Sequence, residues 1–215
     1  MAIKPVLFNT EMVQAILDGR KTCTRRLVKP QPDEQHICPL GYVVHSTEKK
    51  DEGCFGFSVD EHSGSIQYAK LPYQPGDILY IRETWHKYTK RVGNGEGCHL
   101  TEFYGYKASI ANSEDANEPW KPSIHMPKEA ARIWLKVTDV RVERLQEISG
   151  EGALAEGTDK YIHVDGTLNE DQTITSFIGI WNSTIKKADL DRYAWNANPW
   201  VWVIEFERCE KPENE

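Results

Sequence analysis

The sequence predicts an α+β protein built on a small mixed β-barrel, with flanking short helices and long loop insertions. Three observations lead to this fold class: several apolar strands of unequal length, a few short amphipathic helices, and a change of phase inside the longest strand that indicates a bulge. A chain of 215 residues with 39% hydrophobic residues can bury one core, so a single domain over residues 1–215 is expected.

The N-terminal region reads as strand, helix and extended segment in turn. A short strand is expected over residues 3–8, followed by a helix that Asn9 or Thr10 caps and that runs to about Asp18. Gly19 is placed to end this helix in a left-handed conformation. Residues 22–28 read as extended, and the prolines that follow end the regular structure.

The middle of the chain holds two stretches with little periodic signal. A loop insertion is expected at about 30–74, since this stretch is rich in Gly, Ser, Glu, Lys and His. The turn residues Pro75-Gly76-Asp77 then lead into a strand over 78–83. A second irregular region is expected at about 90–128, with a strand over 102–108 inside it.

The C-terminal third shows the clearest patterns. Residues 133–145 read as a long strand, in which the apolar alternation changes phase near Thr138-Asp139. A short helix over 149–156 is closed by Gly157, and helical spacing of apolar residues predicts a longer helix over 174–185. A closing strand over 200–207 carries Trp202, Ile204 and Phe206 on one face.

A cluster of positive charge opposes the acidic balance of the whole chain. The formal net charge is -7, yet five basic residues and no acidic ones lie between Gly19 and Gln31: Arg20, Lys21, Arg25, Arg26 and Lys29. A local positive patch on an acidic protein indicates a particular anionic or polar ligand. The same balance makes broad binding of duplex DNA the least expected function.

Composition also bears on location and on metal binding. The N-terminus lacks the apolar core of a secretory signal and no apolar run is long enough to span a bilayer, so a cytoplasmic protein without a membrane partner is expected.

In a cytoplasmic protein, the five scattered cysteines are expected to be reduced thiols. Zinc could be drawn from loop residues, but no Cys-x-x-Cys pair is present and we expect neither metal nor cofactor; the candidates are His36, Cys38, Cys54, Cys98 and His99.

The motif Gly19-x-Lys21-Thr22-x-Thr24-x-Arg26 after a helix resembles the signature of the ASCH domain, a family of the PUA-like superfamily of small mixed β-barrels. The similarity extends to Pro75-Gly76-Asp77 with its strand and to the closing strand at 200–207. Residues 82–85, 120–127 and 137–140 resemble a subgroup often encoded by phages and prophages. The resemblance implies a protein that binds RNA or modified nucleobases.

Many members of the family carry Glu at the position of Thr24; the Thr found here resembles the bacterial ASCH enzymes that look like N4-acetylcytidine amidohydrolases. Those enzymes use a Lys, a Thr and a Glu, which the resemblance assigns to Lys21, Thr24 and Glu156. Glu147 and Glu151 are rivals for the carboxylate because they lie just before and within the same short helix.

Amide hydrolysis on a nucleobase needs a nucleophile, a proton shuttle and a stabiliser for the oxyanion. Thr24 could be the nucleophile or could orient a water, Lys21 could accept its proton or hold the oxyanion, and Glu156 could protonate the departing nitrogen. The alternative is that Lys21 and Thr24 form only a polar strand edge, with Arg25 and Arg26 solvated.

Further ligand contacts are expected from the basic cluster and from the rest of the motif. The candidates are Arg20, Thr22, Arg25, Arg26, Arg82, Glu83, Trp85, Trp120 and His125. Arg82 could hold a phosphate or pair with Glu83, and Trp85 or Trp120 could stack on a base. Most of the seven tryptophans must pack in the core, however, and Cys23 is either a packed or a reactive thiol.

The sequence therefore predicts binding of RNA or a modified nucleoside in a barrel cleft, with possible hydrolysis of an N-acylated pyrimidine nucleoside. The alternatives are a non-catalytic RNA-binding regulatory module and a single-strand ribonuclease. The oligomeric state is left open.

Overall fold

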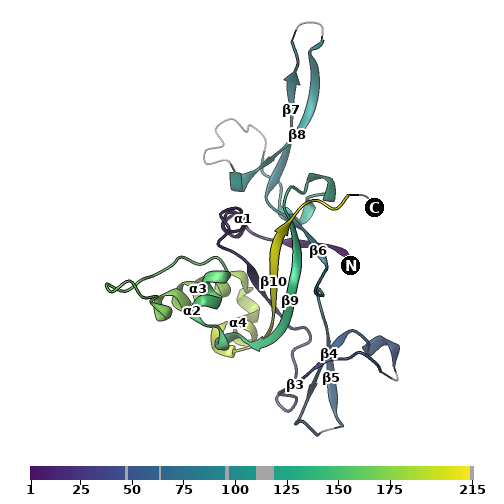
Figure 1. The fold of residues 1–215 in the computed structure, drawn as a ribbon, viewed down its shortest axis with the longest axis vertical. Coiled ribbons are helices and arrows are strands. Elements are labelled where there is room, and N and C mark those ends of the chain that lie inside the picture. The colour runs from purple at the N-terminus through teal and green to yellow at the C-terminus, as the bar shows by residue number, and fades with distance from the viewer. Residues whose placement is uncertain (47, 63, 95–96, 110–118, 214–215) are drawn as a thin grey trace. The chain divides into compact units, whose positions relative to one another are not determined.

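A computed structural model of the chain describes residues 1–46, 48–62, 64–94, 97–109 and 119–213 (Figure 1). The chain divides into two compact units. Unit 1 comprises Met1–Arg20, Gly76–Lys136 and Glu207–Glu215, and unit 2 comprises Lys21–Pro75 and Val137–Phe206. The two longest strands contribute residues to both units.

Unit 1 is organised around a parallel strand pair and a long hairpin. Its elements are β1 (Ile3–Leu7), α1 (Thr10–Leu17), β6 (Ile78–Arg82), β7 (Trp85–Val92), β8 (His99–Tyr106) and the first residues of β9 (Trp134–Arg144). β1 runs parallel to β6, and β6 pairs antiparallel with the start of β9. The Asn9 side chain accepts a hydrogen bond from the Met12 amide and so caps α1, and Gly19 follows the helix with φ +75°.

The core of unit 1 is aromatic. Tyr80 and Trp134 are partners in the β6–β9 ladder and their ring centroids lie 5.9 Å apart. Around them gather other buried side chains: Ile78, Trp85, Met126, Ala130 and Ala131.

Unit 2 contains strands of the large sheet, a second, smaller sheet and the helices that follow α1. Its elements are β2 (Cys23–Leu27), β3 (Cys38–Tyr42), β4 (Cys54–Ser58), β5 (Ile66–Lys70), most of β9, α2 (Gly150–Ala155), α3 (Glu170–Thr184), α4 (Leu190–Tyr193) and β10 (Trp200–Cys209). β10 lies between β9 and β2 and is antiparallel to β2, with Ile204 opposite Thr24. β3, β4 and β5 form the second, antiparallel sheet.

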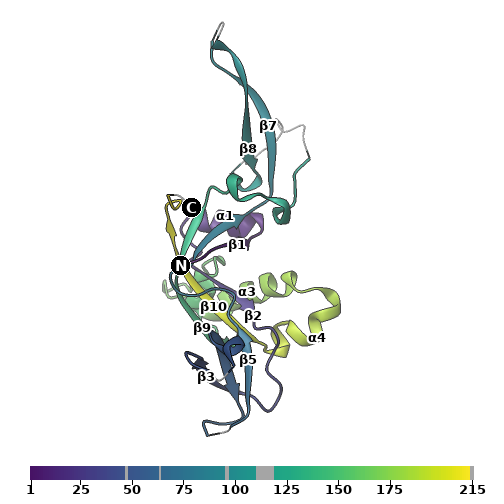
Figure 2. The same cartoon turned by 90° about the vertical axis from the view of Figure 1, so that its right-hand side faces the viewer.

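Successive side chains of β10 point to opposite faces of the sheet, and each face packs against a different part of unit 2. Val201 and Val203 pack with Phe177 and Trp181 of α3. Trp202 points to the other face, where its ring meets Phe55 of β4 at 5.8 Å. The helices and the β3–β5 sheet therefore cover opposite faces of β10, and Figures 1 and 2 show α3 and β3–β5 apart from each other around this strand.

The predicted mixed α+β class is confirmed, with strands predominating over a few helices. Among the described residues there are several sheets, and none of them closes into a barrel. β9 is continuous, and Thr138 and Asp139 are both exposed, so its burial pattern changes phase where the apolar alternation does.

Two stretches that lack a clear periodic signal nevertheless contain strands. The 30–74 stretch holds β3, β4 and β5, which are five residues each and contain Gly or Pro in two cases, so that their alternation is too short to stand out. The 90–128 stretch holds the end of β7 and all of β8. Within these two stretches, residues 47, 63, 95–96 and 110–118 lie outside the described part of the chain.

In the described ranges we find no helix with the length and apolar character that a bilayer crossing demands.

Candidate functional site

From Lys21 onward the basic motif belongs to unit 2 and lies where the start of β2 meets the end of α2. Lys21 forms an isolated antiparallel bridge with Glu156, and the Thr22 amide donates to the Ala155 carbonyl at 2.8 Å. On the other side, the Thr22 carbonyl accepts from the Phe206 amide of β10 at 2.9 Å. Backbone hydrogen bonds thus hold this segment between a helix end and a strand.

Lys21 and Glu156, 135 residues apart in sequence, form a buried ion pair. Lys21 Nζ lies 2.6 Å from Glu156 Oε2 and also donates to the Glu156 backbone carbonyl at 2.9 Å. The side chain of Lys21 is 0% exposed and that of Glu156 is 7% exposed. Because such a pair loses the hydration of both ions, its geometry must be good for the fold to tolerate it.

The way α2 ends explains the position of Glu156. Ser149 caps the start of the helix by accepting from the Gly152 amide, and Glu156 is the C-terminal cap. Gly157 follows with φ +88°, a conformation that glycine adopts without steric cost. The last carbonyls of the helix therefore face β2, where the Lys21 ammonium and the Thr22 amide satisfy them.

The rival carboxylates have other partners. Glu147 accepts from the Arg144 amide at 2.8 Å and forms a capping box with it. Glu151 lies in the first turn of α2 and lines a separate cavity. Of these three carboxylates, Glu156 is the one that meets Lys21.

Arg25 extends the ion pair into a network. Its backbone amide donates to Glu156 Oε1 at 2.5 Å, its Nη1 lies 3.5 Å from the same oxygen, and its Nη2 lies 3.2 Å from Glu143 Oε2. Arg141 then bonds Glu143 at 2.6 Å and pairs with Glu205. Arg25 is only 6% exposed, so the alternative in which this arginine is solvated is wrong.

Thr24 and Arg26 share the other face of β2, because side chains alternate along a strand. Thr24 is 3% exposed. Burial lowers the pKa of Arg26, while the nearby Tyr73 and Glu156 act in the opposite direction. Burial likewise raises the pKa of the Tyr73 hydroxyl, and the Arg26 charge opposes that rise.

Cys23, between the two threonines, is a packed thiol. Burial raises its pKa to about 12, and the charge of Glu156 adds to the rise. Since the thiolate is the reactive form, this environment suppresses the reactivity that neighbouring cations would otherwise promote.

A polar cavity of about 350 Å³ lies on the helix side of β2 in unit 2. Its charged lining residues are two arginines and two glutamates: Arg25, Arg141, Glu151 and Glu205. Lys21, Thr24 and Glu156 are not among the residues that line it.

The other predicted ligand contacts belong to unit 1. Glu83 is 1% exposed and pairs through both oxygens with Arg132, at 2.8 and 2.9 Å. Arg82 instead donates to the Ile124 carbonyl at 3.3 Å. Adjacent side chains of an extended segment point in opposite directions, which is why the expected Arg82–Glu83 pair is replaced by Glu83–Arg132.

The two candidate tryptophans differ in exposure. Trp85 is buried in the unit 1 core, with Lys121 Nζ 5.1 Å from its ring centroid, so it packs rather than presenting a free face. Trp120 is half-buried, and its ring centroid lies 4.6 Å from that of His86.

The last two predicted contacts, His125 and Arg20, are both exposed. His125 ends a short 3-10 turn, and the Arg20 guanidinium lies 3.4 Å from the Asp18 carboxylate.

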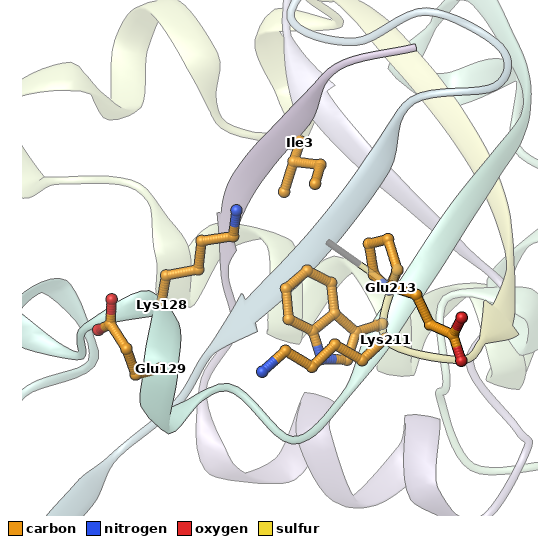
Figure 3. A pocket seen from close by; sticks show the side chains of 7 residues that line it. Ile3, Lys128, Glu129, Lys211 and Glu213 are labelled. Carbon is orange, nitrogen blue, oxygen red and sulfur yellow. The ribbon is translucent and has the colours of Figure 1, made fainter. Parts of the chain in front are cut away.

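Unit 1 also contains a cavity of about 490 Å³ that no prediction anticipated (Figure 3). The ammonium groups of Lys128 and Lys211 point into it, with Trp134 and Ile3 among its walls. The carboxylates of Glu129 and Glu213 point away from it at either edge.

The residues considered for zinc do not assemble. Among the described residues there is no group of three His, Cys, Asp or Glu side chains arranged to hold a metal ion. His36 is engaged by Asp33 at 2.7 Å and by Ser65 at 2.9 Å through its two ring nitrogens.

Sequence reasoning missed the acidic and basic side chains of β9 that complete the network. Asp139, Arg141 and Glu143 alternate with Val140 and Val142 in the longest strand. Because charged and apolar residues alternate with a period of two, the three charged side chains lie on one face of the strand, and this pattern could have indicated a charged surface on that face.

Comparison of the chain with protein-family models, curated proteins and solved structures finds no match.

Proposed function

We propose that the chain is a PUA-like protein of the ASCH type over residues 1–215, which binds RNA or a modified nucleoside through unit 2 and hydrolyses an N-acylated pyrimidine nucleoside there. The observation that carries the proposal is the buried contact between Lys21 and Glu156, at 2.6 Å. These are two of the three residues to which the sequence resemblance gives a catalytic role.

The energetic cost of this pair favours a chemical role over a purely structural one. Burying an ammonium and a carboxylate costs several kcal/mol for each ion, and apolar residues of similar volume often give equal or greater stability. Unit 2 has an apolar core close by, around Val201 and Val203. A site that needs a proton donor and acceptor in contact, shielded from water, gives a reason for the ion pair that packing does not.

The contact supplies the proton donor and acceptor for a balanced hydrolysis, in which the Thr24 hydroxyl would have to reach the Lys21 amine when substrate binds. Proton transfer from the Lys21 ammonium to the Glu156 carboxylate would leave a neutral amine, which could accept the Thr24 proton as the hydroxyl oxygen attacks the acyl carbon. The C–O bond forms, the amide C–N bond breaks, and Glu156 returns its proton to the departing amino nitrogen. Water then releases the acyl group from Thr24 as a carboxylic acid and returns a proton to the Thr24 oxygen, so that Lys21 and Glu156 end the cycle in their starting protonation states.

The cations around Glu156 suit a substrate that develops negative charge. Arg25 bonds the carboxylate directly, and Arg26 shares the strand face of Thr24. A positive surrounding would stabilise the oxyanion of the tetrahedral intermediate, and Arg26 could hold the substrate carbonyl or a phosphate.

We predict that the purified protein releases acetate from N4-acetylcytidine, measured by mass spectrometry of the nucleoside product. Thr24→Val keeps a β-branched side chain but removes the nucleophile, and Lys21→Met removes the shuttle. Each should lower kcat/KM by about 100-fold or more. Thr175→Val, which removes an exposed hydroxyl from α3, is the matched control and should retain activity.

Thermal unfolding of each variant separates lost chemistry from lost folding. A folded Thr24→Val protein with wild-type turnover would refute the role of Thr24. A wild-type protein that shortens an RNA oligonucleotide without added metal, and releases no acetate, would instead identify a ribonuclease.

One observation favours a second candidate, a non-catalytic RNA-binding module. Three donors surround the Glu156 carboxylate: Lys21 Nζ, the Arg25 amide and Arg25 Nη1. A carboxylate bound by so many donors could serve only to fix the two cations in place. Salt-dependent RNA binding without turnover of any N-acylated nucleoside would establish this alternative.

A further inference from the structure

The β7–β8 hairpin of unit 1 carries a row of aromatic rings on one face. The two strands pair antiparallel from Trp85 opposite Tyr106 to Val92 opposite His99 (Figures 1 and 2). Tyr88 lies opposite Phe103 in this ladder, and His86 lies two residues before Tyr88 on the same face. We refer to Trp120, His86, Tyr88 and Phe103 as the aromatic row.

The rings of the aromatic row contact one another in sequence. Ring centroids lie 4.6 Å apart from Trp120 to His86, 5.3 Å from His86 to Tyr88 and 5.8 Å from Tyr88 to Phe103. The last two pairs are stacked, with interplanar angles of 24° and 26°. The row becomes more accessible along the hairpin, since His86 is buried whereas Tyr88 is 37% exposed.

Gly105 is the residue that allows this arrangement. It lies opposite His86 in the ladder, and a Cβ atom there would overlap the imidazole ring. The missing side chain lets the His86 ring lie over the ribbon backbone, between Trp120 and Tyr88. His86 is 4% exposed and, among the described residues, its Nδ1 has no hydrogen-bond partner.

Positive charge accompanies the aromatic row. Lys90 lies two residues beyond Tyr88 on the same face, and Arg91 follows it. Lys87 is paired with Glu102 at 2.7 Å, whereas Lys90 and Arg91 have no ion-pair partner within the part of the chain that the structure describes. On a protein whose net charge is -7, Lys90 therefore places a positive charge on the face of the exposed Tyr88 ring, and Arg91 adds a second one on the opposite face.

We propose that the aromatic row binds single-stranded RNA, with unpaired bases stacking at Tyr88 and Phe103 and a phosphate held by Lys90. Aromatic faces accept any unpaired base, and cations beside them neutralise the backbone. Duplex RNA would not bind in this way, because its bases are already stacked on one another and cannot stack on the aromatic rings. The inference rests on the proposed function only for the choice of RNA; it concerns unit 1 and requires no hydrolysis.

The test is the fluorescence anisotropy of a labelled 12-nucleotide oligouridylate, compared with a 12-base-pair RNA duplex. The 215-residue protein should bind the single strand more tightly than the duplex. Tyr88→Ala should weaken this binding about five-fold or more, and Tyr88→Phe should bind within about two-fold of the wild type. Leu100→Ala is the matched control, because Leu100 is 67% exposed and lies opposite Arg91 on the other face of the same hairpin.

The contribution of the Lys90 charge to RNA binding is measured separately. Lys90→Gln should weaken oligouridylate binding and reduce the slope of log affinity against log salt by about 0.7, the value for one phosphate contact on a single strand.

Three results would overturn the inference: equal affinity for strand and duplex, Tyr88→Ala binding like the wild type, or loss of self-association in Tyr88→Ala by sedimentation in place of lost RNA binding. The last result would identify the row as an interface between copies of the chain. A protein that binds oligouridylate but releases no acetate from N4-acetylcytidine would contradict the hydrolysis and leave the aromatic row supported.

Discussion

Cys23 shows how burial and a neighbouring carboxylate can outweigh nearby positive charge. Lys21 and Arg25 flank the thiol and favour the thiolate, but burial and Glu156 have the larger combined effect, so the pKa rises to about 12. Charges close in sequence would suggest a reactive cysteine. Only the buried position of the side chain determines the direction of the shift.

We predict that Cys23 resists alkylation in the folded protein. A short pulse of iodoacetamide at pH 8, read by peptide mass spectrometry, should label the exposed Cys98 and leave Cys23 unlabelled until denaturant is added. Labelling of both thiols at one rate would contradict the prediction.

The same shift gives a pH dependence of stability. Because the folded pKa lies above the ordinary value of 9.0, the unfolded state loses its proton first. The contribution of Cys23 to the free energy of unfolding is fully present below pH 9 and is lost as the pH rises toward 12. Cys23→Ala should reduce this dependence in urea titrations over that range.

At the scale of elements, the short helix α2 matters because of where it ends. Its six residues are too few for a stable isolated helix, so its caps and its packing through Ala153 hold it. Ser149, Glu156 and Gly157 are recognisable in sequence as cap residues. That the helix end meets the start of β2 depends on backbone pairing across more than a hundred residues.

Gly157→Ala should therefore lower the free energy of unfolding by about 1–2 kcal/mol, because the left-handed conformation at φ +88° disfavours a Cβ. If Glu156 acts as proposed, acetate release should also fall as its carboxylate moves.

Gly179→Ala is the matched control for this substitution. Gly179 is exposed within α3, and a Cβ atom there would meet nothing within 4 Å. The change should raise stability by about 0.5–1 kcal/mol, as measured by chemical denaturation. Equal effects of the two substitutions would show that the end of α2 is not strained.

At the scale of the whole molecule, the 30–74 stretch supplies part of the core of unit 2. Phe57 is 0% exposed, and its ring lies 5.2 Å from Phe55 and 5.4 Å from Trp200. The stretch that the sequence suggests to be an insertion therefore packs directly against β10 and forms part of the core.

Phe57→Ala should cost about 3–5 kcal/mol, because it removes a large side chain from a packed site. Val44→Ala, in the same stretch but 73% exposed, should change stability by less than about 0.5 kcal/mol. Equal, small effects in urea denaturation would show that β3–β5 does not contribute to the core.

The sequence by itself determined the mixed α+β class and indicated the principal helices and strands, because caps, turns and apolar alternation are local signals. It also singled out Lys21, Thr24 and Glu156, through a resemblance whose functional meaning stays a proposal. The tertiary structure decided which of three carboxylates meets Lys21, that Arg25 is buried, that Glu83 pairs with Arg132 and that no described sheet closes. These depend on long-range pairing, since a side chain's partner is set by which strand or helix end folds beside it and not by its neighbours in the chain.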